Sequence, residues 1–96
     1  MPSKSGRAKL STVRRRIDRL DGALLRLVNQ RAALALLIGR IKKRRKWPVF
    51  DAEREVFVLR RVRQANRGLL SAGAITHIFQ AILCECRRRE RSVTKP

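Results

Sequence analysis

The sequence predicts an all-α fold, built from a protomer of three helices with one long N-terminal helix. Apolar residues recur every three or four positions in three segments, and no segment alternates with the two-residue period of a strand. Trp47-Pro48 and the stretch from Asn66 to Ser71 separate the three segments. With 96 residues the chain has room for one domain, and its 44% hydrophobic content is enough for a packed core.

The first helix is predicted from about Leu10 to about Lys43. Its apolar positions alternate spacings of three and four, which is the pattern of a heptad seam, with an arginine at position 31 as the one interruption. Pro48 prevents the helix from continuing, and the residue before it is expected to be extended. The apolar positions, which we call the heptad seam, are Leu10, Val13, Ile17, Leu20, Leu24, Leu27, Leu34, Ile38 and Ile41.

The second helix is predicted to begin after Asp51, a favourable N-cap residue, and to end at Asn66-Arg67-Gly68. Its apolar face is Val58, Leu59, Val62 and Ala65.

The third helix is predicted to begin after Ser71 and to end at about Arg91. Its apolar stripe is Ile75, Ile78, Phe79, Ile82 and Cys86. The helical domain thus covers residues 10–91, and we expect the basic N-terminal tail, residues 1–9, and the C-terminal tail, residues 92–96, to be disordered.

The length of the first helix predicts a dimer. A helix of about 33 residues is about 50 Å long, whereas a compact monomer of this size is only about 35 Å across. Because two shorter helices cannot cover so long a seam, we expect the long helices of two copies to pack against each other.

The net charge is extreme, with 25 Lys and Arg against 7 Asp and Glu, or +18. Nucleic acid is the first anionic partner to consider. The chain has only four aromatic residues, so few side chains are available for bases to stack on. It also has no motif of an RNA-binding domain or of a zinc-dependent DNA-binding domain. We therefore expect a solvated basic surface and no nucleic-acid partner.

Other classes are excluded on similar grounds. The chain has two cysteines, Cys84 and Cys86, and a single histidine, which make neither a disulfide framework nor a metal site. We expect both cysteines to be reduced thiols. The N-terminus has no apolar signal segment, and the longest apolar run, 32–38, is far short of the roughly 20 residues that span a bilayer. We expect a cytoplasmic protein without a membrane partner.

Charged residues stand where apolar ones are expected. Arg31 interrupts the heptad seam, and Lys42, eleven residues later, faces within about 20° of it. Ala35 lies between them and Gly39 flanks it, so two cations and small residues form a notch for a small anion.

The third helix has a similar anomaly at Glu90, which extends its apolar stripe. Desolvation there is expected to raise the pKa of this carboxyl toward neutrality. Arg54 and Glu55, in the first turn of the second helix, add another charged pair. Salt bridges between helices are the alternative for any one of these groups, but several together favour an anion-binding pocket.

These segments, in this order and spacing, resemble the all-helical class of chorismate mutases. The matching pieces are Val13-Arg14-x-x-Ile17-Asp18-x-x-Asp21, Leu24-Leu25 through Asn29-Gln30-Arg31-Ala32, Ile38-Gly39-x-x-Lys42, Pro48-Val49-x-Asp51-x-x-Arg54-Glu55, and Ile78-Phe79-x-x-Ile82 with Cys86 and Glu90. The resemblance implies an intertwined six-helix homodimer that converts chorismate to prephenate in phenylalanine and tyrosine biosynthesis. A Claisen rearrangement of this kind needs no nucleophile, metal or cofactor, only a held conformer and stabilised charge.

The resemblance also implies roles for the cationic residues. Arg31 would bind a substrate carboxylate within its own protomer, whereas Arg14 would reach the site of the other protomer. Arg54 would bind on the carboxylate side, and Lys42 would donate to the ether oxygen and to a carboxylate.

The remaining implied site residues are acidic or small. Glu90 would donate a second hydrogen bond to the ether oxygen, which requires a protonated carboxyl. Asp51 and Glu55 would lie near the ring hydroxyl of the substrate, with Glu55 as the direct acceptor, and Cys86 would line the pocket. The implied catalytic residues are therefore Arg31, Lys42 and Glu90.

Three alternatives remain open from the sequence. The same cations suit a 4-amino-4-deoxychorismate mutase or an isochorismate-pyruvate lyase. A non-catalytic basic helical dimer that binds nucleic acid is the more distant alternative, since the arginine runs at 60–61 and 87–89 have no role in the mutase interpretation.

Overall fold

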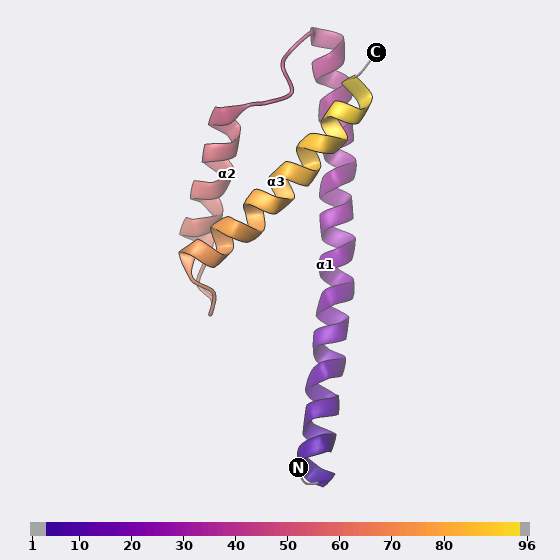
Figure 1. Ribbon diagram of the computed structural model, residues 1–96, viewed down its shortest axis with the longest axis vertical. Helices are drawn as coiled ribbons and strands as arrows, with labels where there is room; N and C mark the ends of the chain where they lie inside the picture. The colour runs from indigo at the N-terminus through magenta and orange to yellow at the C-terminus, as the bar shows by residue number, and fades with distance from the viewer. Residues whose placement is uncertain (1–3, 95–96) are drawn as a thin grey trace. The chain divides into compact units, whose positions relative to one another are not determined.

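The computed structural model describes residues 4–94. These residues form three α-helices and no strand: α1 (Lys4–Arg45), α2 (Ala52–Ala65) and α3 (Ala72–Thr94) (Figure 1). The all-α prediction is confirmed for this part of the chain. The chain divides into two compact units, Met1–Gln30 and Arg31–Pro96.

The first unit contains the N-terminal part of α1. Its seam residues are largely exposed in the single chain, with Leu20, Leu24 and Leu27 at 63%, 58% and 57%. The helix begins at Lys4, so the expected disorder of residues 4–9 is wrong. These residues include good helix formers such as Ala, Lys and Arg, and they contain no proline. The first three residues of the predicted tail lie outside the described residues.

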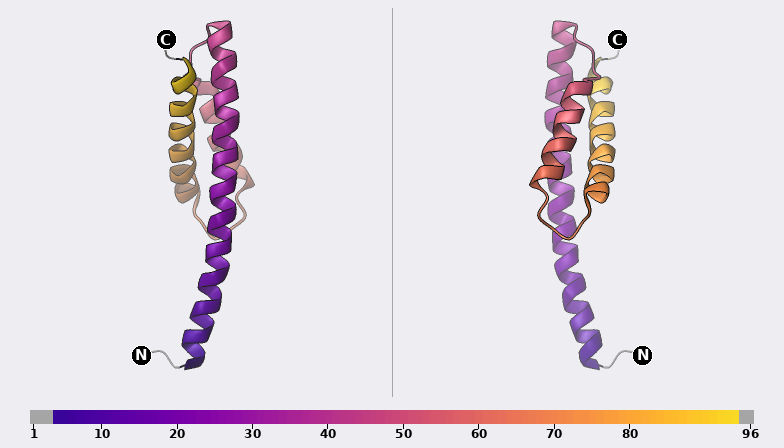
Figure 2. Two further views of the ribbon diagram at one scale, coloured as in Figure 1. Left: turned by 90° about the vertical axis from the view of Figure 1, so that its right-hand side faces the viewer. Right: turned by 90° about the vertical axis from the view of Figure 1, so that its left-hand side faces the viewer.

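The second unit contains the end of α1 together with α2 and α3. The two shorter helices pack against each other and are joined by residues 66–71 (Figures 1 and 2). All three helices contribute to a small buried core: Ala35, Val58, Leu83 and Cys86. Leu83 was missing from the predicted stripe of the third helix, whereas Ile78, which was included, is 43% exposed.

The C-terminus of α1 is closed by a Schellman motif before the proline. Lys46 adopts the left-handed conformation with φ 58°. The amide of Trp47 donates to the carbonyl of Lys42 at 2.9 Å, and the amide of Lys46 donates to the carbonyl of Lys43 at 3.3 Å. The predicted break ahead of Pro48 is therefore confirmed, and the chain turns toward α2.

Both predicted N-caps are confirmed. The side chain of Asp51 accepts a hydrogen bond from the amide of Arg54 at 3.0 Å, and Ser71 Oγ accepts one from the amide of Ala74 at 3.0 Å. The second helix ends at Ala65 with Asn66 as its C-cap, as expected. The third helix continues to Thr94, so residues 92–94 of the predicted C-terminal tail are helical, and residues 95–96 lie outside the described part.

Gly39 lies where α1 and α3 approach each other closely. A Cβ atom built at this position would lie 2.7 Å from the carbonyl oxygen and 2.9 Å from the Cα of Glu90, and 2.6 Å from Cγ2 of Val93. Two of these atoms belong to the backbone and cannot move aside cheaply. Glycine therefore lets the two backbones come together and brings Glu90 beside α1.

One described helix segment, Ser5–Arg45, is long and apolar enough to cross a membrane by length and composition alone. Core helices of water-soluble proteins pass the same test, so this indicates a membrane span only weakly. The helix passes this test although its longest uninterrupted apolar run is short, because the test averages hydropathy over a window that also includes polar residues.

Candidate active site

A cavity of about 490 Å³ lies within the second unit, a size typical of sites for small molecules. All three helices and the segment before α2 line it. The lining residues are Arg31, Leu34, Ala35, Ile38, Lys42, Val49, Asp51, Arg54, Glu55, Val58, Leu83, Cys86, Arg87 and Glu90.

Helical spacing explains why these residues face one space. On α3, the residues Leu83, Cys86, Arg87 and Glu90 follow at intervals of three, four and seven from the first, which places them on one face. The N-cap Asp51 and the α2 residues Arg54, Glu55 and Val58 have the same intervals. On α1, Arg31, Ala35, Ile38 and Lys42 share a face over three turns, at intervals of four, seven and eleven from the first. Each helix thus presents one stripe that carries both apolar and charged side chains.

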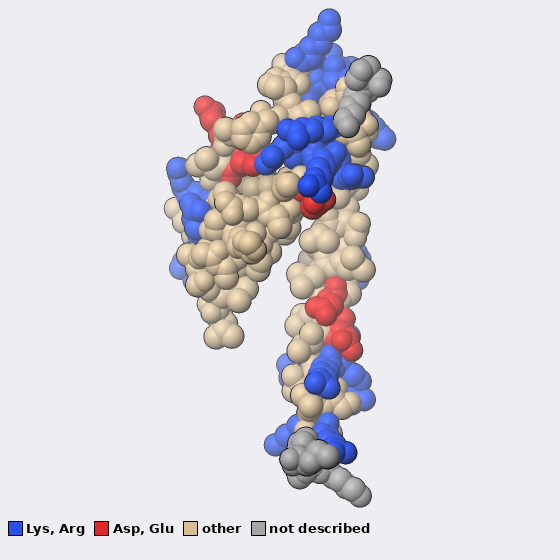
Figure 3. All heavy atoms as spheres, in the orientation of Figure 1, with Lys and Arg blue, Asp and Glu red and all other residues tan. Residues whose placement is uncertain are grey.

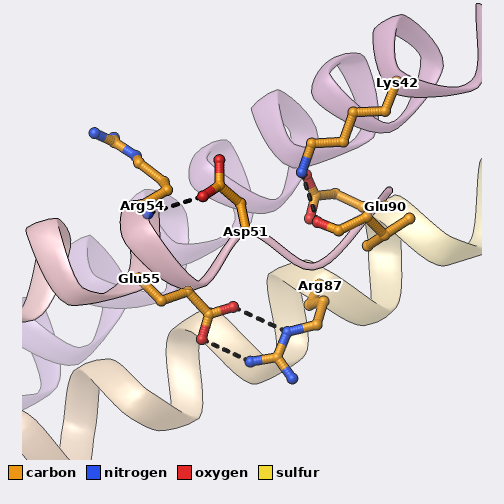
Figure 4. Close-up of polar contacts among 7 residues, drawn as sticks. Lys42, Asp51, Arg54, Glu55, Arg87 and Glu90 are labelled. Carbon is orange, nitrogen blue, oxygen red and sulfur yellow. Dashed lines mark hydrogen bonds and ion pairs between the residues drawn. The ribbon is translucent and has the colours of Figure 1, made fainter. Parts of the chain in front are cut away.

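Lys42 and Glu90 form one of two ion pairs at the cavity. Lys42 Nζ lies 3.0 Å from Glu90 Oε1, and the same ammonium donates to the carbonyl oxygen of Val49 at 2.6 Å (Figure 4). The two charged side chains are only 15% and 13% exposed. Because a partly buried charge pair with hydrogen bonds is held more firmly than a surface pair, the ammonium has a fixed position in the cavity.

Glu55 and Arg87 form the second ion pair. Arg87 Nη2 lies 2.7 Å from Glu55 Oε1 and Arg87 Nε lies 3.0 Å from Glu55 Oε2, a bidentate arrangement between α2 and α3 (Figure 4). The Arg87 guanidinium also lies over the ring of Phe50, 5.0 Å from its centroid. Three contacts therefore fix this arginine at the cavity wall.

Asp51 and Arg54 contribute to the cavity from the first turn of α2. Asp51 caps the helix through Oδ1, so its carboxylate is fixed beside the positive end of the helix dipole. The guanidinium of Arg54 lies 5.2 Å from the centroid of the Phe57 ring. Among residues 4–94, Arg54 makes no ion pair with a carboxylate.

Arg31 is the second cation of the cavity without an ion pair inside the described part of the chain. It is half-buried and lies at the end of the stripe that Ala35 and Lys42 continue. A half-buried guanidinium is stabilised by an anion, and the unfilled space beside it is where a small anion fits. The notch predicted between Arg31 and Lys42 is thus part of the cavity, although Gly39 packs against α3 and is not among the residues that line it.

The charges of the lining favour an anionic ligand. Four side chains are cationic and three are carboxylates, so the formal charge of the lining is +1. Other basic side chains surround the C-terminal ends of α1 and α3 (Figure 3). A small anion that enters the cavity is therefore attracted both at a distance and within the site.

Seven of the eight predicted site residues line the cavity: Arg31, Lys42, Asp51, Arg54, Glu55, Cys86 and Glu90. Arg14, the eighth, is exposed on α1 in the first unit, and its role stays a prediction. The sequence reasoning missed Arg87. Its signal was the helical spacing, because it follows the buried Leu83 by four residues and precedes Glu90 by three.

The donor set does not suggest a metal site. Within residues 4–94, no group of three or more His, Cys, Asp or Glu side chains is placed to hold a metal ion. Cys86 is buried in the cavity wall and Cys84 is half-buried, and both thiols are free. The cavity thus offers guanidinium, ammonium and carboxyl groups as its polar chemistry.

Fold and cavity together define an all-helical domain with a cavity, lined by an excess of cationic side chains, formed by three helices. Residues 13–91 match the family model of chorismate mutase type II. The chain belongs to this family, because the match covers most of its length. The resemblance derived from the sequence motifs is thereby confirmed.

Curated relatives agree with the family model. A bifunctional chorismate mutase/prephenate dehydratase of Aquifex aeolicus is 36% identical over 89 residues, which cover 88% of this chain and 25% of the relative. A protein of the same name from Neisseria gonorrhoeae is 40% identical over 81 residues, covering 84% of this chain and 22% of the relative. A chorismate mutase of Methanocaldococcus jannaschii is 36% identical over 56 residues, 58% of this chain and 57% of the relative. The chain thus spans about a quarter of the length of the two bifunctional relatives.

Proposed function

We propose that this chain is a chorismate mutase, which rearranges chorismate to prephenate without a cofactor. The observation that supports this most strongly is the convergence of Arg31, Lys42, Arg54 and Glu90 on one cavity in a chain of the chorismate mutase family. In this rearrangement the ether C–O bond breaks while a C–C bond forms within the same molecule. The protein therefore has to hold a folded dianion and stabilise charge on the ether oxygen.

Lys42 is the proposed donor to that oxygen. An ammonium has three N–H groups, and two of them are used by Val49 and Glu90 in the absence of substrate. The third remains for the ether oxygen, with the nitrogen already held in place. A donor fixed before the reaction costs no reorganisation as the charge develops, which is the condition for strong electrostatic catalysis.

Glu90 is the proposed second donor, in its protonated form. A neutral carboxyl has one oxygen that accepts and one hydroxyl that donates. Oε1 would go on accepting from Lys42 while the proton on the other oxygen is directed to the ether oxygen. Arg31 and Arg54, which make no ion pair within residues 4–94, would bind the substrate carboxylates, and Asp51 and Glu55 would lie near the ring hydroxyl.

A homodimer is the proposed assembly. The heptad seam is exposed in the single chain on both sides of position 31, with Leu24 at 58% and Leu34 at 60%. An apolar stripe of this length on a water-soluble helix indicates a covering surface, and a second copy supplies one with the same heptad pattern. A second copy packed on this stripe would also explain why α1 is apolar without placing it in a membrane, in agreement with the proposed cytoplasmic location.

The charge of the cavity supports a contribution from the second copy. Its lining has a formal charge of +1, whereas the proposed substrate carries two carboxylates. Arg14 of a second protomer would raise the charge of the site to balance the dianion, and protonation of Glu90 would add to the attraction. We therefore propose that Arg14 acts across the dimer interface.

The test is to incubate purified protein with chorismate and follow its ultraviolet absorbance. We expect the absorbance to fall and acid treatment of the product to yield phenylpyruvate. Stable absorbance, with salt-dependent retention of the protein on a DNA column, would instead support the non-catalytic nucleic-acid binder. Consumption of isochorismate with release of pyruvate, but no consumption of chorismate, would support the lyase.

A further inference from the structure

Arg87 is a cavity residue to which the proposed mechanism gives no role. Of the three consecutive arginines at 87–89, it alone lines the cavity. Its neighbour Arg88 pairs with Glu85 on the surface, where the two side chains are 62% and 65% exposed. The Arg87–Glu55 pair is 24% and 23% exposed, so its electrostatic effect is screened much less by solvent.

The Arg87 guanidinium changes what Glu55 can bind. Both oxygens of Glu55 already accept a hydrogen bond from Arg87, at 2.7 and 3.0 Å. Each carboxylate oxygen has a second lone pair, so Glu55 can still accept from a hydroxyl. The pair as a whole is neutral, however, and a cation placed on Glu55 would lie within a few ångströms of the guanidinium.

The neighbouring carboxylate does not offset this effect. Asp51 accepts from the amide of Arg54 as the N-cap of α2, where the helix dipole offsets part of its charge. This end of the cavity therefore presents fixed acceptors whose negative charges are balanced by Arg87 at Glu55 and in part by the helix at Asp51. Such a surface suits a neutral donor and disfavours an ammonium group.

We propose that Arg87 is a positioning residue that selects, through Glu55, a substrate whose ring carries a neutral hydroxyl over the analogue whose ring carries an ammonium group. This inference rests on the proposed function, in which Glu55 lies near the ring substituent. It addresses the choice between chorismate and 4-amino-4-deoxychorismate, whose alkyl amine is protonated at neutral pH. The cations that hold the carboxylates do not distinguish the two compounds, whereas the Glu55–Arg87 pair does.

The test compares kcat/KM for chorismate and for 4-amino-4-deoxychorismate in the full-length protein. The original chain is expected to prefer chorismate. Arg87→Met keeps the length of the side chain and removes its charge, which leaves Glu55 free to pair with the ammonium. We expect the ratio of the two kcat/KM values to shift toward the amino compound by about 10-fold or more. The reason is that the guanidinium repels an ammonium group only a few ångströms away, and the shielded site screens this repulsion little.

Three variants make the result specific. Arg87→Lys keeps a positive charge beside Glu55 and is expected to retain the preference for chorismate. Arg87→Gln removes the charge but still donates a hydrogen bond to Glu55, so it gives the same test if Arg87→Met does not fold. Arg88→Met removes an equal charge from the surface and is the control for general electrostatic attraction, with an unchanged ratio expected.

An unchanged ratio in a folded Arg87→Met or Arg87→Gln variant, with the original chain active on chorismate, would overturn the inference and leave the proposed function intact. An original chain that prefers the amino compound would overturn it as well. If the original chain converted neither compound, the proposed function would fail, and the inference with it. A shift of the same size in Arg88→Met would mean that net charge, and not the pair with Glu55, sets the preference.

Discussion

Lys42 and Glu90 are 48 residues apart in the sequence, yet Nζ of the one lies 3.0 Å from Oε1 of the other (Figure 4). The contact joins the last turn of α1 to the last part of α3. It exists because Gly39, one turn before Lys42, lets the backbone of α3 approach α1. The two groups proposed to act on the ether oxygen are therefore held together before a substrate arrives.

Removal of the Lys42 ammonium should greatly reduce turnover. Lys42→Ala is expected to lose on the order of 100-fold or more in kcat, as for the loss of one donor to a developing oxyanion. The measurement is the initial rate of chorismate consumption at saturating substrate. Lys43→Ala is the matched control, since Lys43 is exposed and lies outside the cavity. A loss of only a few-fold in Lys42→Ala, with Lys43→Ala unchanged, would show that Lys42 is not the donor.

Glu90 should make the rate depend on pH. A carboxyl donates a hydrogen bond only when it is protonated, so the proposed role requires kcat to fall wherever that proton is lost. Glu90→Gln places a donor there at every pH and should flatten the profile. Glu85→Gln is the control on the same helix, because Glu85 is exposed and pairs with Arg88. Identical profiles for Glu90→Gln and the original chain would remove Glu90 from this role.

Most of the cavity could be predicted because helical periodicity is a local property. The eleven-residue spacing of Arg31 and Lys42 places them on one face of any α-helix, whatever packs against it. Asp51, Arg54 and Glu55 likewise share one face at the start of α2. The sequence predicts where this helix starts, because Asp51 is a favourable N-cap residue. Glu90 could be singled out in the same way, because it extends the apolar stripe of α3, and the family resemblance then implied its role in the site.

What could not be predicted depends on how the helices pack against each other. Spacing places Arg87 near the face of Glu90 but does not say which carboxylate lies opposite it. The packing of Leu83 in the core sets the rotation of α3, and that rotation brings Arg87 to Glu55 while Arg88 stays on the surface. The start of α1 was also misplaced, since a disordered tail was inferred from its position at the chain terminus although nothing in residues 4–9 ends a helix firmly.

Mixing two defective variants tests whether Arg14 acts across the dimer. If Arg14 belongs to the partner's site and Arg31 to its own, Arg14→Ala and Arg31→Ala homodimers both have two damaged sites. A mixed dimer has one site with both changes and one intact site. After unfolding and refolding of an equal mixture, random pairing should restore about a quarter of the original activity. Activity that stays at the level of the separate variants, with dimers present by sedimentation, would mean that both arginines serve the same protomer's site.

Gly39 should be intolerant of even one added methyl group. In Gly39→Ala the new Cβ would meet the backbone of Glu90 at 2.7 and 2.9 Å, so α1 and α3 must separate. Alanine gains about 1 kcal/mol of helix propensity, but overpacking typically costs about 1–3 kcal/mol. We expect a lower free energy of unfolding in urea and, because Lys42 moves away from Glu90, a lower kcat. Gly73→Ala, whose Cβ meets only Ser71 Oγ at 3.9 Å, is the control and should be unchanged or slightly more stable. A Gly39→Ala protein as stable and as active as the original would show that the close approach of the two helices is not required.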